Sequence, residues 1–132
     1  MKKAENWQNK HTYRSSAKWI YGNFVDYDNN FRAITRKAKV RFETRDWARA
    51  RSDLSERIEL YEKSVLNTVN GIKDRHQNMP LGMADWDSIQ SVYWDRVAGV
   101  PHGQFAKTFF NSVYRTVLRS EGKDPKHISD TA

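Results

Sequence analysis

Apolar residues recur with helical spacing from Asp46 to Ile72. They are separated by three or four positions, which places them on one face of an α-helix with 3.6 residues per turn. The members of this stripe are Trp47, Ala50, Leu54, Ile58, Tyr61, Val65, Val69 and Ile72. Asp46 precedes the stripe and can accept a hydrogen bond from a backbone N–H of the first turn. The pattern predicts a long amphipathic helix, about 40 Å long at 1.5 Å per residue.

A second stripe of the same period lies upstream and predicts a helix over about 18–43. Its members are Ile20, Phe24, Tyr27, Phe31, Ile34, Ala38 and Phe42. Gly22 weakens this helix by about 1 kcal/mol relative to alanine, but the apolar positions continue past it. Only Thr44 and Arg45 separate the two predicted helices before Asp46. Because so short a link forces neighbouring helices to run antiparallel, we expect a long helical hairpin.

Helix signals fail between Lys73 and Asp85, where asparagine, proline and glycine indicate a loop. Beyond the loop, apolar positions with helical spacing predict two shorter helices, one over about 86–97 with Asp85 as its cap and one over about 103–119. Gly122 follows the second of these at the place of a left-handed C-terminal cap.

No segment alternates between apolar and polar positions as a half-buried strand does. The predicted fold is therefore all-α, a long antiparallel helical hairpin with two shorter helices packed on it. We divide the chain into a flexible basic N-terminal segment over 1–17, a helical domain over 18–122 and a frayed C-terminal tail over 123–132. The predicted structural core comprises Phe24, Tyr27, Phe31, Ile34, Phe42, Trp47, Leu54, Ile58, Tyr61, Val65, Phe109 and Val113.

The composition fits a helical protein with thin apolar stripes and solvated outer faces. The 132 residues include five Trp, six Tyr and six Phe, yet 30% of the chain is charged. The lack of cysteine excludes disulfides and Cys-ligated metals, and makes a reducing compartment the default. No apolar run approaches the roughly eighteen residues of a membrane span, and the N-terminus lacks an apolar signal core. We therefore expect a cytoplasmic protein that does not enter a membrane.

The net charge of +7 is concentrated between Arg32 and Arg51, where eight basic residues face only Glu43 and Asp46. Such a patch can bind nucleic acid, an acidic protein or a phosphate, although a solvated helix face and turn is the favoured explanation. The basic residues surround a turn and a helix end and do not follow one recognition face, which disfavours nucleic-acid binding. A small basic nucleic-acid-binding protein remains an alternative, as does a helical adaptor for a protein partner.

The residues indicate no active site. The four histidines lie far apart without a second ligand at metal-binding spacing, and the glycines form no phosphate-binding loop. The catalytic triplets of protein kinases do not occur. Ser112 lies in an aromatic-rich stretch, but it has no base in sequence reach, and a helical serine usually bonds its own backbone. We predict no catalytic, cofactor-binding or metal-binding residue in this chain.

Two stretches resemble a known family. The first contains Phe24-x2-Tyr27-x3-Phe31-x2-Ile34-Thr35, Ala38-x3-Phe42-Glu43-x-Arg45-Asp46-Trp47 and Arg57-Ile58-x-Leu60-Tyr61. The second is Ala106-Lys107-Thr108-Phe109-Phe110-Asn111-Ser112-Val113-Tyr114-Arg115. In this order, the two stretches resemble the N-terminal part of the bacterial isocitrate dehydrogenase kinase/phosphatase, over about residues 19–125.

The resemblance implies a partial regulatory domain. In the family, a mostly helical regulatory domain precedes a catalytic domain of protein-kinase type. That second domain binds ATP and magnesium, and it phosphorylates and dephosphorylates a serine of isocitrate dehydrogenase, which controls the glyoxylate bypass. No kinase-type position occurs in the present residues, so no catalytic or nucleotide-binding residue is carried over and the chain alone is expected to be inactive. Gln104 and Lys107 stand where the family tends to have acids.

The resemblance also implies the partner, which would be isocitrate dehydrogenase or the missing remainder of the kinase/phosphatase. The predicted partner surface consists of Arg36, Arg41, Arg45, Trp94 and Phe110. An incomplete domain leaves some apolar side chains uncovered. We expect such an exposed patch at Phe109, Phe110 or Trp94.

Overall fold

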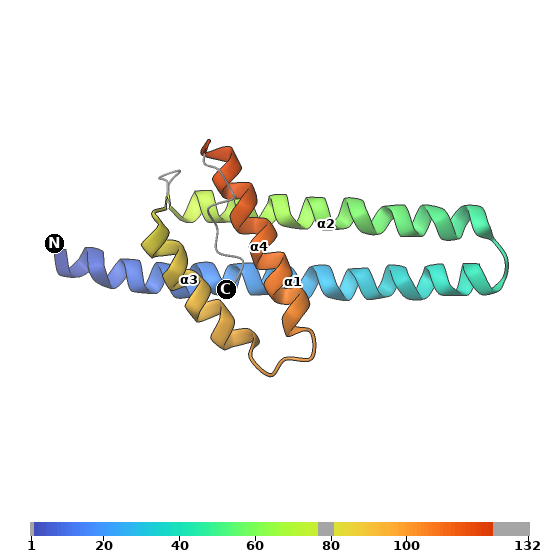
Figure 1. The fold of residues 1–132 in the computed structure, drawn as a ribbon, viewed down its shortest axis with the longest axis horizontal. Coiled ribbons are helices and arrows are strands. Elements are labelled where there is room, and N and C mark those ends of the chain that lie inside the picture. The colour runs from blue at the N-terminus through green and yellow to red at the C-terminus, as the bar shows by residue number, and fades with distance from the viewer. Residues whose placement is uncertain (1, 77–80, 123–132) are drawn as a thin grey trace.

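The computed structural model describes residues 2–76 and 81–122, with side chains from Tyr13 onward. The helices of this part are α1 (Lys2–Glu43), α2 (Trp47–Arg75), α3 (Met83–Val97) and α4 (Gly103–Ser120). Figure 1 shows α1 and α2 side by side and antiparallel, with α3 and α4 crossing them away from their connecting turn. No strand occurs within 2–76 or 81–122, and the predicted all-α class is confirmed.

The turn between α1 and α2 ends one helix and starts the next within three residues. The N–H of Asp46 donates to the carbonyl of Arg41 (2.8 Å) and the N–H of Arg45 to that of Phe42 (3.1 Å), which satisfies the last carbonyls of α1. Arg45 has a φ of 62°, a left-handed conformation that costs a residue with a side chain about 1–2 kcal/mol. The Asp46 carboxylate accepts a hydrogen bond from the N–H of Arg49 (3.4 Å), as the sequence predicts.

Helix α1 begins at Lys2, well before the predicted start at Lys18. The early residues show no regular stripe, but Ser16 and Ala17 are fully buried against the rest of the fold. The Tyr13 hydroxyl donates to the Asp85 carboxylate, a bond that raises the pKa of Tyr13 to about 12. Tertiary contacts therefore support helix where the local pattern does not predict it. The flexibility proposed for 1–17 stays a prediction, and the proposed tail over 123–132 lies outside the described residues.

Helix α3 begins at Met83, a few residues before its predicted start, and Asp85 is not its N-cap. Gly82 takes that position with an extended backbone, and its N–H donates to the Asp85 carboxylate (3.0 Å). Asp85 thus occupies the third helical position and makes one of the two bonds of a capping box, since glycine has no side chain for the other. At the end of α4, Gly122 has a φ of 75°, which confirms the predicted left-handed cap.

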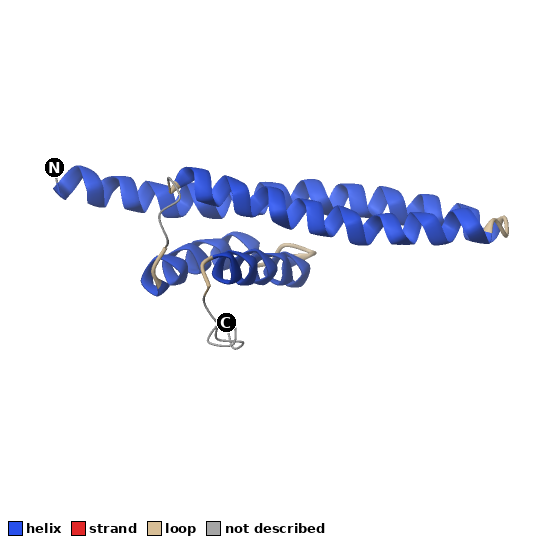
Figure 2. Ribbon diagram, turned by 90° about the horizontal axis from the view of Figure 1, so that it is seen from above, coloured by secondary structure: helices blue, strands red, loops and turns tan. Residues whose placement is uncertain are grey.

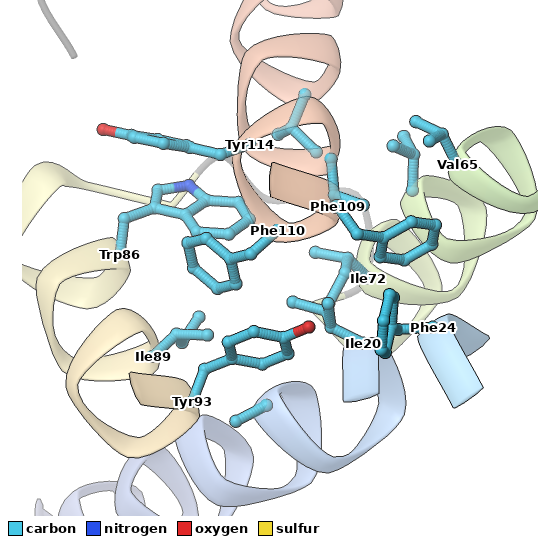
Figure 3. Close-up of a cluster of buried hydrophobic side chains, with 14 of the residues drawn as sticks. Ile20, Phe24, Val65, Ile72, Trp86, Ile89, Tyr93, Phe109, Phe110 and Tyr114 are labelled. Carbon is cyan, nitrogen blue, oxygen red and sulfur yellow. The ribbon is translucent and has the colours of Figure 1, made fainter. Parts of the chain in front are cut away.

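The core lies where α3 and α4 cover one face of the hairpin (Figures 2 and 3). The ring of Phe109 in α4 lies 5.8 Å from the rings of Phe24 and Tyr27 in α1 and 6.0 Å from the ring of Tyr61 in α2. Phe109 has no exposed surface, and burial of such a side chain contributes about 1.5–3 kcal/mol. One phenylalanine therefore holds α4 to both helices of the hairpin.

A second aromatic group joins α3 to α4. The ring of Phe110 lies 4.9 Å from that of Tyr93 and 6.0 Å from that of Trp86, and all three side chains are buried. The Tyr93 hydroxyl donates to the carbonyl of Ala106 (2.8 Å), and burial raises the pKa of Tyr93. The short helices form a unit that closes over the hairpin.

The predicted core is only partly buried. The structure buries Phe24, Val65, Phe109 and Val113, and half-buries Tyr27, Phe31, Ile34 and Tyr61. The core assignment is wrong for four residues, whose side chains are exposed: Phe42, Trp47, Leu54 and Ile58. Toward the turn, α2 buries Ala50 and Asp53, so its apolar stripe lies beside the interface with α1. That stripe is covered only where α4 packs on it.

Two glycines provide a matched test of this packing. A Cβ on Gly71 would lie 2.3 Å from the indole of Trp19, whose Nε1 donates to the carbonyl of Thr68 (3.0 Å). A Cβ on Gly22 would meet no atom within 4 Å. We expect Gly71→Ala to lower the free energy of unfolding by about 1–3 kcal/mol and Gly22→Ala to raise it by about 0.5–1 kcal/mol. Urea unfolding of both variants checks this, and equal shifts would contradict the described approach of α1 and α2.

The end of α2 carries a pH-sensitive contact. Burial lowers the pKa of His76 below its usual 6.5, and its Nε2 lies 3.2 Å from the Ser16 hydroxyl. A lowered folded-state pKa means that protonation favours the unfolded chain, so this stability is complete above pH 6.5 and is lost as the pH falls through the folded-state pKa. We expect the free energy of unfolding to decline below that pH, and to decline less in His76→Gln. An unchanged slope in the variant would contradict this assignment.

Candidate functional site

The hairpin extends beyond α3 and α4 toward its turn (Figures 1 and 2), and an apolar groove lies along this uncovered half. We call it the distal groove. It consists of two adjoining depressions that share Arg51 and Leu54, and the larger has a volume of about 530 Å³. Its lining comprises Tyr27, Phe31, Phe42, Trp47, Ala50, Arg51, Leu54, Ser55, Arg57, Ile58, Tyr61 and Glu62.

The distal groove begins where α4 ends its contact with the hairpin. The Tyr27 ring stacks on Phe109 with an interplanar angle of 20°, and the Tyr61 ring meets Phe109 edge-on at 87°. The hydroxyls of Tyr61 and Ser112 are hydrogen-bonded to each other. Ser112, the hydroxyl that sequence reasoning considered as a nucleophile, therefore helps to fix α4 beside the groove. The groove is a continuation of the surface on which α4 packs.

The wall of the distal groove includes a cation with unused hydrogen-bonding capacity. The Arg57 guanidinium lies over the Phe31 ring, 4.7 Å from its centroid, and its Nη1 donates to the Thr35 hydroxyl (3.1 Å). Its Nε is buried and has no acceptor among the described residues. Because Arg57 is only half-buried as a residue and lines the groove, its positive charge favours an acidic group of a partner there.

Near the turn, two exposed aromatic rings close the groove. Phe42 of α1 and Trp47 of α2 lie 4.8 Å apart with an interplanar angle of 84°, and each is about half exposed. An edge-on pair of this kind stabilises the turn modestly, by about 0.5–1.5 kcal/mol. The same rings leave a large apolar area available to a partner.

A buried ion pair lies between the two helices behind the groove. Asp53 is almost fully buried, with the Arg41 Nη1 at 2.7 Å and the Lys37 Nζ at 3.8 Å from its Oδ1. Arg41, predicted as partner surface, is instead half-buried and bound to Asp53. Sequence reasoning missed Asp53, although its place three residues after Ala50 puts both on one face of α2.

The predicted basic patch is partly neutralised within the chain. Besides the two cations at Asp53, the Arg32 guanidinium pairs with Asp28 (3.0 Å) and that of Arg49 with Asp46 (3.5 Å). Arg36 and Arg45, both predicted as partner surface, are exposed. Four of the eight basic residues between 32 and 51 are thus engaged with acids of the same chain.

The exposed apolar patch was predicted at the wrong place. Phe109 and Phe110 are fully buried, because the α3–α4 unit folds back on the hairpin. Trp94 is half-buried, with the Phe110 ring at 5.3 Å and the Lys107 ammonium over its own ring at 5.3 Å. Two exposed aromatic side chains, Phe42 and Trp47, lie in the distal groove toward the turn of the hairpin, and a further one, Phe105, lies in the first turn of α4.

The lining of the distal groove is suited to binding. Within the described ranges, no three His, Asp or Glu side chains converge where a metal ion could be held. Over the same residues, no helix combines the length and the apolar character needed to cross a membrane. The groove offers apolar area and guanidinium groups, which are the components of a protein interface.

The Asp53 ion pair makes a measurable prediction. Asp53→Ala leaves Arg41 without its carboxylate in a partly buried position, so we expect the free energy of unfolding to fall by about 1–3 kcal/mol. Asp28→Ala removes the more exposed pair with Arg32 and should cost about 0.5 kcal/mol or less. Denaturant unfolding of the two variants measures the difference. Equal losses of unfolding free energy would show that the burial of Asp53 does not make its ion pair more stabilising than the exposed pair.

The comparisons with known proteins agree with the sequence resemblance. The family model for "Isocitrate dehydrogenase kinase/phosphatase (AceK), regulatory domain" matches residues 17–129. The isocitrate dehydrogenase kinase/phosphatase of Anaeromyxobacter sp. (strain Fw109-5) is 33% identical over 106 residues, which is 80% of this chain and 18% of that protein. That of Xanthomonas campestris pv. campestris (strain 8004) is 32% identical over 105 residues, again 80% and 18%.

A third relative extends the match slightly. The kinase/phosphatase of Anaeromyxobacter dehalogenans (strain 2CP-C) is 33% identical over 112 residues, or 85% of this chain and 19% of that protein. The chain thus spans less than one fifth of the length of the curated relatives that it matches. No solved structure matches the chain.

Proposed function

The chain belongs to the isocitrate dehydrogenase kinase/phosphatase family as part of its regulatory domain, and from this premise we propose that it is a helical docking unit without catalytic machinery of its own. Docking is favoured because the described surface presents apolar and guanidinium groups. The carrying observation is the distal groove, since an uncovered apolar surface of this length is typical of a protein interface.

We further propose the activity in which this unit takes part. The complete protein would phosphorylate and dephosphorylate isocitrate dehydrogenase in the cytoplasm, with ATP and magnesium bound outside the present residues. The described side chains include no candidate set of magnesium ligands, so no step of that chemistry is assigned to them. The contribution of this chain would be contact, either with isocitrate dehydrogenase or with the remainder of the kinase/phosphatase.

For the contact with isocitrate dehydrogenase we favour the basic end of the hairpin. Arg36 and Arg45 are exposed there, and Arg45 is held in the left-handed conformation of the turn. Nucleic acid is the competing ligand, because the net charge of +7 attracts any polyanion. The ion pairs of Arg32, Lys37, Arg41 and Arg49 reduce the charge that is free to contact phosphates, which disfavours that alternative.

A titration separates the two ligands. We expect the purified chain to bind isocitrate dehydrogenase from the same organism saturably in calorimetry, and to bind duplex DNA weakly at low and moderate salt. Arg36→Glu combined with Arg45→Glu should weaken binding to the dehydrogenase by about tenfold, because two favourable charge contacts become repulsive. Two exposed basic residues outside this end, changed in Lys63→Glu with Arg119→Glu, provide a control of equal net charge.

The outcomes are distinct. Salt-sensitive DNA binding without binding to the dehydrogenase would overturn the docking proposal in favour of the basic patch. Equal weakening by both double variants would show that net charge, and not the hairpin end, governs the contact. Binding to neither ligand would remove isocitrate dehydrogenase as a direct partner of this chain.

A further inference from the structure

We propose that the distal groove is the seat of one amphipathic helix with acidic flanks, supplied by the part of the kinase/phosphatase outside the present residues. This rests on the proposed function, since it requires that the chain acts within that protein. It adds the position of the contact, the secondary structure of the occupant and the sign of its charge.

The distal groove continues the surface on which α4 packs, and this continuity indicates that its occupant is a helix. Along α2, Leu54 and Ile58 continue the stripe that Val65 and Val69 present to the core. From Trp47 to Tyr61 this stripe extends for about 20 Å, which is the length of about four helical turns. A surface of that length, with apolar side chains at intervals of three or four residues, fits a helix in a groove better than it fits a small molecule.

The charge around the groove indicates the sign of the charge that the occupant carries. Residues 27–62, between the first and the last residue that line the groove, contain nine basic side chains and seven acidic ones. Arg51 and Arg57 line the groove itself, and Glu62 is its acidic lining residue, at the end nearer α4. Arg57 is half-buried at the wall of the groove, and its guanidinium charge favours a carboxylate on the occupant. Acidic side chains of the occupant are therefore expected where it passes Arg51 and where it passes Arg57.

The same charge disfavours a second copy of this chain. Pairing two hairpins through their distal grooves would bring two regions of net positive charge together, and this repulsion opposes assembly. The relatives offer another source, because more than four fifths of their length lies outside the region matched by this chain. We therefore assign the occupant to the same kinase/phosphatase and not to a copy of the hairpin.

A peptide array tests the proposal directly. Overlapping peptides of about 18 residues, long enough for five helical turns, would cover the Anaeromyxobacter sp. (strain Fw109-5) kinase/phosphatase outside its matched region. We expect the labelled chain to bind a small set of amphipathic peptides of net negative charge. Their affinities would then be measured in solution, with synthetic versions whose Glu and Asp are replaced by Lys as charge-reversed probes.

Two matched variants place the binding on the chain. Ile58 and Leu66 are both exposed residues of α2, but only Ile58 lines the distal groove. We expect Ile58→Asp to weaken peptide binding by about tenfold or more, because it puts a charge into the apolar surface of the distal groove. Leu66→Asp should change the affinity by less than about twofold. Arg51→Glu should weaken the binding of the acidic peptides and strengthen the binding of the peptides that carry lysine.

Other results would overturn the inference. These are an array without binding, a preference for basic peptides, or equal effects of Ile58→Asp and Leu66→Asp. A concentration-dependent dimer in sedimentation that Ile58→Asp abolishes would assign the groove to a second copy. Loss of isocitrate dehydrogenase binding in Ile58→Asp, with no peptide bound, would assign it to the dehydrogenase. Because the array contains no dehydrogenase, failure here is distinguishable from failure of the proposed contact through Arg36 and Arg45.

Discussion

The burial of Phe109 between the two long helices is the contact on which the described fold depends. Its ring meets Phe24 and Tyr27 of α1 and Tyr61 of α2, so one side chain fixes α4 on the hairpin. Phe110, the next residue, points to the α3 side and packs on Tyr93 (Figure 3). Because adjacent residues of a helix face different directions, this pair lets α4 bind the hairpin with one side and α3 with another.

The same contact determines where the covered surface ends. Beyond Tyr61, α2 turns Ala50 and Asp53 toward α1, and its apolar side chains stay beside the interface. The hairpin is held there by small residues and by the pairing of Asp53 with Arg41, which needs little apolar contact between the helices. An apolar stripe remains exposed along the distal half, and binding there would not disturb the core.

This division of the hairpin belongs to a regulatory domain. One half is a packed core in which Ser112 and Tyr93 are engaged in bonds that hold helices together. The other half combines apolar area with guanidinium groups, which serve recognition. The match to the regulatory domain over residues 17–129 includes both halves. The proposed docking role rests on this division of the hairpin together with the family match.

The sequence by itself determined most of each helix, because apolar periodicity and the caps at Asp46 and Gly122 act over a few neighbouring residues. It did not predict the part of α1 before Lys18 or the first residues of α3. It could also identify the family, whose residue pattern survives without knowledge of the fold. The sequence could not locate the buried core. An amphipathic stripe shows that one face of a helix is apolar, but it does not show which element packs on that face. Only the tertiary structure decided that α4 covers Val65 and leaves Ile58 exposed, because that depends on how far the α3–α4 unit reaches along the hairpin.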